Sequence, residues 1–425
     1  MKRILLVSMA AVLPLTSLAQ SRPQDERYIV TFKSGDSQAD KAQAVRQAGA
    51  SLRHNYSIID AAAISVTNSN ALNGLQRNPA VVSITRDLTV RAVPAGRDVE
   101  ANGKPGGGGG GGSSEAIQPG VLRVGVPTAN SNGADIGIAI VDTGIDLNNV
   151  EFTGAVHADQ YTAFSGTCQD DEGHGTHVAG IAGARANGVG TVGVAPNATL
   201  YCAKVLDQTG SGSDSDVIGG LQFVLGKTTI RVVNMSLGRD RGTDEEDAPM
   251  QAAIKALYDA GVSVVVSAGN DAAKEISSQV PARFPEVLAI ASTTAAAGAN
   301  AGCRFYSGAI AADTASFFTT DGAGVAVSAP GDEKEDISRS CFITGVGVLS
   351  TKLGGGTVRM SGTSMASPHV AGVVARMLQK GVASTPAGIR SALAASASGK
   401  GTAPKDSGAS SYTSDGTREG IAQAP

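Results

Sequence analysis

Five short apolar runs without polar alternation follow one another in the second part of the chain. Stretches with the pattern of amphipathic helices lie between some of them, at Asp214–Leu225 and Glu245–Ala260. Strands that are apolar on both faces are covered on both faces, as in a parallel sheet between helices. We therefore predict an α/β domain over residues 116–425. The five runs are Ile136–Val141, Leu200–Leu206, Arg231–Leu237, Val262–Ala268 and Val287–Ala291.

Residues 20–95 have a different pattern, with shorter strand-like and helix-like stretches. Their order, β-α-β-α-β with room for a split in the middle strand, suits a ferredoxin-like module. We therefore predict a small α+β unit ahead of the α/β domain. The expected strands are Tyr28–Phe32, Ile58–Thr67 and Val81–Thr85, and the expected helices are Asp40–Ala48 and Asn70–Gln76.

Two further segments belong to neither unit. Residues 1–19 place Lys2 and Arg3 before a mostly apolar stretch that ends in small residues, which is typical of a secretory signal peptide. This stretch is too short for a comfortable membrane span, and no other run is longer, so we expect no membrane anchor. A cytosolic protein with an amphipathic N-terminal helix is the alternative. Residues 96–115 contain the glycine run Gly106–Gly112, which predicts a flexible, protease-accessible linker.

Composition narrows the classes of function. Of the 425 residues, 42% are apolar and 4% are aromatic, with no tryptophan. This suffices for a sizeable core but makes a surface that stacks sugars or bases improbable. The 34 basic and 38 acidic side chains give a net charge of −4 without a basic cluster. Nucleic acid is therefore not expected as the main partner.

The cysteines fit an oxidising compartment. There are four of them, none in a CxxC pair, so zinc or thiol-redox chemistry has little support. Four cysteines allow three pairings. We expect Cys168–Cys202 and Cys303–Cys341, because each pair lies within one region of the α/β domain. The first bridge would brace the loop that carries His174.

Three motifs carry residues suited to nucleophilic catalysis: Asp142 in IVDTGI, His174 in GHGTHVAG and Ser364 in GTSMASPH. A serine hydroxyl becomes a nucleophile when an imidazole takes its proton, and a carboxylate fixes the tautomer of that imidazole. His174 and His177 could instead suggest a metal pair, but no HExxH pattern or third ligand is evident. The order Asp, His, Ser, and the alanine at position 366 where GxSxG needs glycine, speak against an α/β-hydrolase esterase or lipase.

These motifs and their order resemble the subtilases, the subtilisin-like serine peptidases, over about residues 118–395. The resemblance implies that Asp142, His174 and Ser364 form a catalytic triad. It also implies a three-layer subtilisin-like domain with a mostly parallel sheet. The expected activity is that of a secreted serine endopeptidase that works through an acyl-enzyme and requires no cofactor for its chemistry. Because a fold does not guarantee activity, a catalytically inactive secreted binding protein is the alternative.

Two more segments match motifs of that family. Asn270, which follows Ser-Ala-Gly, matches the asparagine of the oxyanion hole, and the segment Asn234–Gly238 resembles the strand edge that pairs with an extended peptide. Arg239 then stands where the family often has a small residue. The resemblance assigns the walls of the main specificity pocket, whose small and apolar character favours an uncharged side chain. One wall is Ser236, Leu237 and Gly238, and the other is Ala268 and Gly269.

Residues 20–95 resemble the inhibitor-type propeptide of subtilases. Such a propeptide assists folding and inhibits its own enzyme, with its tail in the cleft. An independent binding module is the alternative. We expect Ser364 to make the first cut in its own chain between about Val90 and Glu115. The mature enzyme is expected to be an extracellular or periplasmic monomer that acts on peptide or protein substrates.

A structural calcium ion is a further expectation. The segment Arg185–Thr191 resembles a calcium-binding loop of many subtilases, and Glu151 stands where the family supplies a carboxylate. Calcium needs several oxygen ligands, so backbone carbonyls would have to add to Glu151 and Asn187. A plain glycine-rich turn with a surface glutamate is the alternative.

Overall fold

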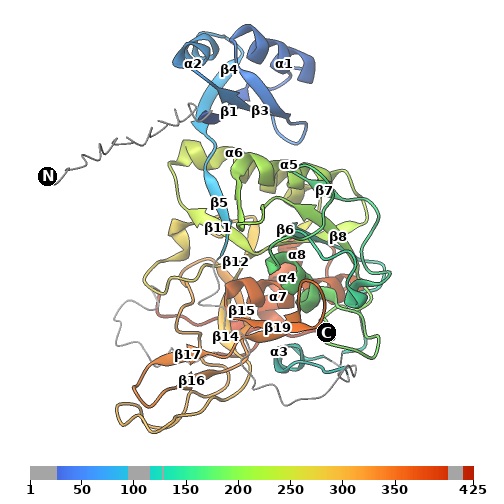
Figure 1. The fold of residues 1–425 in the computed structure, drawn as a ribbon, viewed down its shortest axis with the longest axis vertical. Coiled ribbons are helices and arrows are strands. Elements are labelled where there is room, and N and C mark those ends of the chain that lie inside the picture. Colours follow the sequence, from blue (N-terminus) through green and yellow to red (C-terminus); the bar gives the residue numbers. More distant parts are fainter. Residues whose placement is uncertain (1–25, 94–114, 127–128, 401–414) are drawn as a thin grey trace, which may run out of the picture.

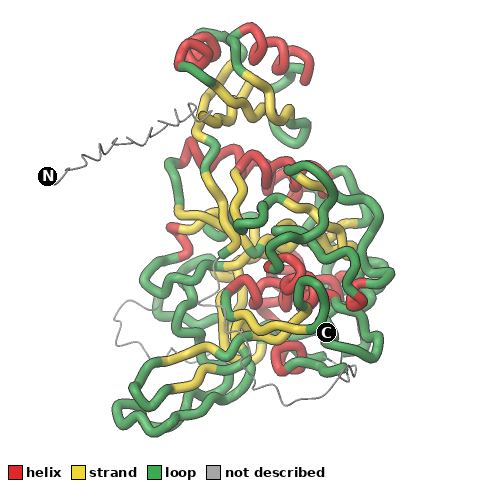
Figure 2. The backbone as a smooth tube through the Cα atoms, in the orientation of Figure 1, coloured by secondary structure: helices red, strands yellow, loops and turns green. Residues whose placement is uncertain are grey.

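The computed structural model of the chain describes residues 26–93, 115–126, 129–400 and 415–425. A small N-terminal unit stands at one end of a larger body in Figure 1. Figure 2 shows the body as strands enclosed by helices, with many loops at the end away from the N-terminal unit. The expected signal peptide and the glycine run lie outside the described residues.

The N-terminal module, residues 26–88, has the element order β-α-β-β-α-β. Its sheet has the order β2-β3-β1-β4, with every neighbouring pair antiparallel. This is the ferredoxin-like arrangement that the sequence predicts, but the additional strand β2 precedes the predicted region Ile58–Thr67 and is not a part split from it. The single strand predicted over Ile58–Thr67 begins later, because residues 56–60 form the turn of the hairpin β2-β3. The elements are β1 (Glu26–Phe32), α1 (Gln38–Gln47), β2 (Ser51–Asn55), β3 (Ala61–Val66), α2 (Ser69–Gln76) and β4 (Val81–Arg86).

The body is built on a nine-stranded sheet of order β20-β21-β15-β14-β12-β10-β6-β8-β7. Within this sheet, all neighbouring pairs of described strands from β21 to β7 are parallel, and the outer pair β20-β21 is antiparallel. The five apolar runs all contribute strands to this sheet, whereas β7, β15, β20 and β21 are not predicted. The strands are β6 (Gly137–Asp142), β7 (Tyr161–Thr162), β8 (Thr199–Lys204), β10 (Ile230–Met235), β12 (Ser263–Ser267), β14 (Val287–Thr294), β15 (Val325–Asp332), β20 (Ser398–Lys400) and β21 (Gly420–Ile421).

Helices cover both faces of this sheet, which gives the three layers of the predicted fold. Two separate hydrophobic cores pack against the sheet. Alternate residues of β6 enter different cores: Ile138 packs in the first core and Ala139 in the second. Side chains of α3, α4, α7 and α8 join the first core, and side chains of α5 and α6 join the second. The helices are α3 (Pro119–Arg123), α4 (His174–Gly183), α5 (Asp214–Leu225), α6 (Asp244–Asp259), α7 (Thr363–Gln379) and α8 (Pro386–Ser396).

A second, four-stranded sheet lies on the body beside the central one. Its order is β13-β11-β5-β9, and each neighbouring pair is antiparallel. In Figure 1 strand β5 descends from the N-terminal module into the body, next to β11. We call residues 89–93 the tail strand. The members of the sheet are β5 (Thr89–Ala92), β9 (Ser211–Ser213), β11 (Leu237–Asp240) and β13 (Gln279–Val280).

The N-terminal module contacts helices α5 and α6 through polar groups. The Tyr56 hydroxyl donates to the Ser215 carbonyl over 2.7 Å, and Asp87 accepts from the Ser215 amide at 2.8 Å and from its hydroxyl at 2.7 Å. Arg86 pairs with Glu246 of α6 at 3.1 Å. The module is thus fixed over the first turns of both helices.

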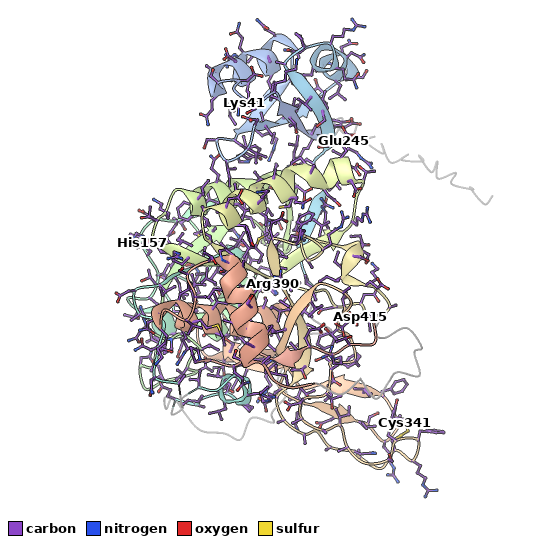
Figure 3. All side chains as sticks on the ribbon, turned by 180° about the vertical axis from the view of Figure 1, so that it is seen from behind. Lys41, His157, Glu245, Cys341, Arg390 and Asp415 are labelled. Atoms are coloured by element: carbon purple, nitrogen blue, oxygen red, sulfur yellow. A yellow bond between two sulfur atoms is a disulfide. The ribbon has the colours of Figure 1, made fainter. Side chains whose placement is uncertain are left out.

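Both expected disulfides are present. Cys168–Cys202 joins the loop before α4 to β8, and Cys303–Cys341 links the segment between β14 and β15 to the segment between β15 and β18 (Val348–Thr351), which together form a separate lobe. Figure 3 labels Cys341 near the outer end of this lobe. The lobe also holds the hairpin of β16 (Glu335–Ile337) and β17 (Ile343–Gly345), while β18 pairs with β19 (Thr357–Met360).

Candidate active site

The candidate catalytic residues meet at one edge of the central sheet. Asp142 ends β6, Asn270 follows β12, and Ser236 follows β10. His174 is the first residue of α4, and Ser364 is the second residue of α7. Because the carboxyl ends of parallel strands share an edge, residues far apart in the chain gather there.

Asp142 and His174 are joined by a buried hydrogen bond. The distance between His174 Nδ1 and Asp142 Oδ1 is 2.8 Å, and the two residues are 5% and 0% exposed. Burial of the ring lowers the pKa of His174, but the carboxylates of Asp142, Glu172 and Asp170, with Asp142 first among them, together more than offset this, so the net pKa is raised. The carboxylate of Asp142 thus stabilises the protonated imidazolium. Because Nδ1 is bonded to Asp142, Nε2 lies on the side of the ring away from this carboxylate.

Two neighbouring carboxylates, which the motifs do not single out, fix this pair. Asp170 accepts from the Thr143 hydroxyl at 2.9 Å and from the Thr176 amide at 2.9 Å, which ties the end of β6 to the first turn of α4. Glu172 accepts from the His174 amide at 2.7 Å. Acidic residues just before a helix are stabilised by the positive end of the helix dipole. The sequence Asp-Asp-Glu-Gly-His before α4 is the signal from which the roles of Asp170 and Glu172 could have been predicted.

Ser364 is fully buried beneath the tail strand. Its hydroxyl donates to the Val93 carbonyl at 3.1 Å and approaches the Ser236 carbonyl at 3.4 Å. His174 Nε2 has no hydrogen-bond partner among the described residues. The structure therefore joins Asp142 to His174, but the hydroxyl of Ser364 is turned toward Val93 and not toward the imidazole.

The orientation of Asn270 is set by the residue before the candidate nucleophile. Its Oδ1 accepts from the Thr363 amide at 2.8 Å and from the Thr363 hydroxyl at 2.9 Å. Gly269, with φ of 125°, donates its amide to the same Thr363 hydroxyl at 3.2 Å. Because the oxygen of the amide is engaged on this side, its NH₂ group points the other way.

Ser236 contributes its backbone, and not its side chain, to the groove. The hydroxyl contacts the Ser364 carbonyl at 2.9 Å and the Ser367 hydroxyl at 2.9 Å, so it fastens the start of α7. The carbonyl of Ser236 accepts from the Val93 amide at 3.3 Å. Leu237 and Gly238 continue the pairing, opposite Ala92 and Arg91.

The tail strand has the geometry of an extended peptide inserted between two strands. It pairs with β11 on one side and with β9 on the other. Val90 and Val93 are buried, at 1% and 9% exposure, whereas Arg91 is exposed. Main-chain hydrogen bonds with alternate side chains in pockets are the usual mode of binding an extended peptide.

The two other histidines of the motifs lie in closed surroundings. His177 Nε2 is 3.0 Å from the Val348 carbonyl, and His369 Nδ1 is 2.8 Å from the Met365 carbonyl. Burial lowers the pKa of His177 to about 3 and that of His369 to about 4. Both rings are therefore neutral at physiological pH and pack in the core.

The residues of the expected calcium site lie close together. Asn187 donates to the Val150 carbonyl at 3.2 Å, and a Cβ at Gly190 would lie 2.1 Å from a Glu151 carboxylate oxygen. The other carboxylate oxygen of Glu151 is buried without a partner, and burial raises its pKa to about 7. In the described parts of the chain no three His, Cys, Asp or Glu side chains form a metal-binding group. A cation here would depend on carbonyl oxygens.

Comparison with known proteins decides the family. The family model described as the subtilase family, peptidase family S8, matches residues 133–416, which is more than half of the chain. This chain belongs to the subtilase family. It is therefore a hydrolase of peptide bonds of the serine endopeptidase class.

Similar proteins are found at moderate identity. Subtilisin E of Bacillus subtilis (strain 168) is 28% identical over 381 residues, covering 88% of this chain and 85% of that protein. Subtilisin of Bacillus pumilus is 30% identical over 289 residues, covering 67% of this subtilase and 92% of the relative.

Solved structures agree with the fold. The crystal structure of a cold adapted subtilisin-like serine proteinase has a TM-score of 0.56 at 30% identity, and covers 74% of this subtilase and 99% of that chain. Fervidolysin from Fervidobacterium pennivorans, described as a keratinolytic enzyme related to subtilisin, has a TM-score of 0.67. At 23% identity, over 96% of this chain and 61% of the other, it supports the fold alone. No helix among the described residues is long and apolar enough to cross a membrane.

Proposed function

We propose that this subtilase is a secreted endopeptidase that uses Asp142, His174 and Ser364 as its triad and is made as a self-processing precursor. The observation that carries the proposal is the placement of the tail strand. It lies between β9 and β11 with the Val93 carbonyl 3.1 Å from the Ser364 hydroxyl oxygen. A peptide carbonyl thus already lies beside the nucleophile.

In this mechanism His174 Nε2 takes the proton of the Ser364 hydroxyl as the oxygen attacks the carbonyl carbon of the substrate. Asp142, at 2.8 Å from Nδ1, keeps the imidazole in the required tautomer and stabilises its cation. The protonated Nε2 then gives its proton to the leaving amine, and the acyl-enzyme forms. Water, deprotonated by His174, hydrolyses that ester and restores the Ser364 hydroxyl.

Asn270 is the proposed side-chain donor to the oxyanion, together with the backbone amide of Ser364 at the start of α7. The bonds from Thr363 to Oδ1 hold the amide in place before any substrate binds. Such preorganised donors stabilise the negative oxygen of the tetrahedral intermediate without moving during the reaction. The positive end of the 17-residue helix α7 adds to this field.

The groove itself gives the proposed mode of substrate binding. Peptide or protein substrates would replace the tail strand, with Ser236, Leu237 and Gly238 as one wall of the main pocket. Ala268 and Gly269, at the end of β12, are the proposed opposite wall. These small and apolar residues favour an uncharged side chain before the scissile bond.

The proposed precursor has four parts: a signal peptide (1–19), an inhibitory propeptide (20–95), a glycine-rich processing region (96–115) and the catalytic domain (116–425). The contacts of Tyr56 and Asp87 with helix α5 support the second part, because they hold the module on the body and its tail in the groove. The first cut is proposed within Val90–Glu115, and attack on the carbonyl at Val93 would leave Pro94 as the new first residue. Secretion, with a monomer as the mature form, completes the proposal.

No cofactor is proposed for the chemistry, but a structural calcium ion fits the surroundings of Glu151. An unpartnered, buried carboxylate oxygen would be neutralised there by a cation. Asn187 and the carbonyls of its loop would complete the oxygen ligands. Such an ion would stabilise the fold and take no part in the reaction.

The test separates an active enzyme from an inactive binding protein on the same fold. A serine-directed phosphonate should label Ser364 in the matured protein, and Ser364→Ala should abolish both labelling and hydrolysis. Intact mass of the Ser364→Ala precursor, made in a host without other secreted proteases, should show the propeptide still attached. Maturation of this variant at the wild-type position and rate would refute the assignment of the nucleophile.

A further inference from the structure

The groove that holds the tail strand has two walls that share no backbone hydrogen bonds in their sheet. The order β13-β11-β5-β9 places β5 between the walls β11 and β9. Because neighbouring strands lie about 4.8 Å apart, the two walls are roughly 10 Å from each other. A peptide between them satisfies both edges. Once that peptide leaves, something else has to keep their spacing.

A buried ion pair bridges these walls directly. Arg239 belongs to β11, and Asp214 follows β9 as the first residue of α5. Arg239 Nε is 3.0 Å from Asp214 Oδ1, and Nη2 is 2.8 Å from Oδ2, so the guanidinium binds both carboxylate oxygens. The side chains are 6% and 1% exposed. The long side chain of Arg239 is able to span the distance between the two walls. An ion pair with a shorter side chain would not bridge them.

The pair lies on the buried side of the tail strand. Leu237 faces Ala92 and Gly238 faces Arg91. Counting one residue further along both antiparallel strands brings Arg239 level with Val90. Residues directly opposite each other in a sheet point to the same face. Val90 is 1% exposed, and on its other side it faces Gly212 of β9. If Val93, next to Ser364, is counted as the first residue before the cut, Val90 is the fourth. The ion pair therefore lies beneath the fourth residue of the bound peptide.

The guanidinium is held in place from a second direction. Asp247 of α6 accepts from Arg239 Nη1 at 2.8 Å, and Arg283 holds the other oxygen of Asp247 at 3.0 Å. Bidentate arginine–carboxylate pairs fix direction as well as distance. Burying the charged side chains of Arg239, Asp214 and Asp247 removes their hydration, which costs free energy. Such a cluster therefore adds little to the free energy of unfolding compared with apolar side chains in the same place. A role of this cluster in fixing the distance between the two walls explains its presence better than a role in stability.

We propose that the Arg239–Asp214 pair sets the width of the peptide groove and so selects a small apolar side chain at the fourth position before the scissile bond. Arg239 is a positioning residue, because it acts through the two walls and does not touch the reacting atoms. The inference rests on the proposed function to the extent that substrates take the place of the tail strand.

The test uses the matured enzyme and two variants that keep the charges. Arg239→Lys keeps the positive charge but cannot grip both oxygens of Asp214. Asp214→Glu keeps the pair but lengthens it by one methylene group. Arg241→Met is the matched control, since this arginine lies two residues further along, is 42% exposed and pairs with the exposed Asp244.

Three substrates are compared: a tetrapeptide anilide with Val at the fourth position, the same peptide with Phe there, and an acetylated single-residue ester that has no residue at the fourth position. In Arg239→Lys, kcat/KM for the Val peptide should fall at least tenfold, mainly through KM, while the ester changes less than twofold. In Asp214→Glu the preference for Val over Phe should fall at least fivefold. Arg241→Met should match the wild type.

Equal losses on the ester and on the peptides would overturn the proposal, because they indicate general damage to the fold. Unchanged selectivity in both variants would overturn it as well. If Arg239→Lys does not fold, Asp214→Glu alone decides. Failure of the proposed function is a different result, namely a wild-type protein that neither hydrolyses the ester nor reacts with the phosphonate.

Discussion

Asp87 is the residue through which we expect the N-terminal module to be most easily loosened. Its carboxylate accepts two hydrogen bonds from Ser215, at 2.8 Å from the amide and 2.7 Å from the hydroxyl, in the first turn of α5. If the first cut separates the module from the body, these contacts still hold it there. Asp87→Ala removes both and should release the module sooner.

The size of the effect follows from the contacts. Hydrogen bonds to a charged group contribute about 1.5–3 kcal/mol each, and a helix N-terminus adds about 0.3–1 kcal/mol for a nearby anion. Burial opposes this, since it raises the pKa of Asp87 even though Ser215 stabilises the ionised form. We take the net loss as about 2 kcal/mol, which is about 30-fold in the inhibition constant of the cut module.

The assay starts from the full chain, allowed to process itself and then diluted stepwise. Activity on a peptide anilide as a function of concentration gives the inhibition constant of the bound module. Asp87→Asn keeps an acceptor and should have a smaller effect, while Arg77→Ala, exposed at the end of α2, should have none. An inhibition constant for Asp87→Ala within threefold of the wild type would refute this reasoning.

Three further changes test other parts of the structure. Asn270→Ala should lower kcat by about 10²–10³ with little change in KM, a magnitude established for subtilisin itself; steady-state kinetics with a matching rise in KM would contradict the oxyanion role. Burial raises the pKa of Glu151 from 4.5 to about 7. Between these pH values the folded state keeps a proton that the unfolded state has lost. In the absence of calcium, the free energy of unfolding should therefore fall as the pH rises through this window. Calcium requires the ionised carboxylate, so it should raise Tm more at about pH 8 than at about pH 5.5, and an equal shift at both would speak against the site. Replacing Cys168 and Cys202 by serine opens a loop of 34 residues and should cost about 4 kcal/mol in urea unfolding of the Ser364→Ala protein; a cost under about 1 kcal/mol would be incompatible with loop-closure entropy.

Local patterns in the sequence were enough to predict the central strands, both disulfides and the residues around the candidate triad. The positions of Asp142, His174 and Asn270 are predictable because each lies in a distinctive motif at or just after the end of a strand, or at the start of a helix. The contact of Asp87 with Ser215 is not, because it joins residues 128 positions apart through ordinary side chains. The same holds for Arg239, where the sequence shows a departure from the family but not the two carboxylates that surround it.

Strand β15 also shows where the pattern fails. Its run Val325–Asp332 contains serine, proline, glycine and aspartate, so it lacks the apolar continuity of the other strands. It becomes a strand because β14 pairs along most of its length and α7 packs against it. Tertiary contacts therefore decide its conformation, and these contacts are not visible in a local reading of the sequence.

The pairing of β21 with β15 has a consequence for the order in which the molecule can be completed. Ile421 and Ala422 are fully buried, Ala422 donates to the Ser328 carbonyl, and Ala424 donates to the Val124 carbonyl near the start of the body. Synthesis proceeds from the N-terminus, so the edge of β15 stays uncovered until residue 421 has emerged. Uncovered sheet edges attract other strands. A chain that has emerged only as far as β15 therefore has this edge open, and the sheet is completed only when β21 pairs with it.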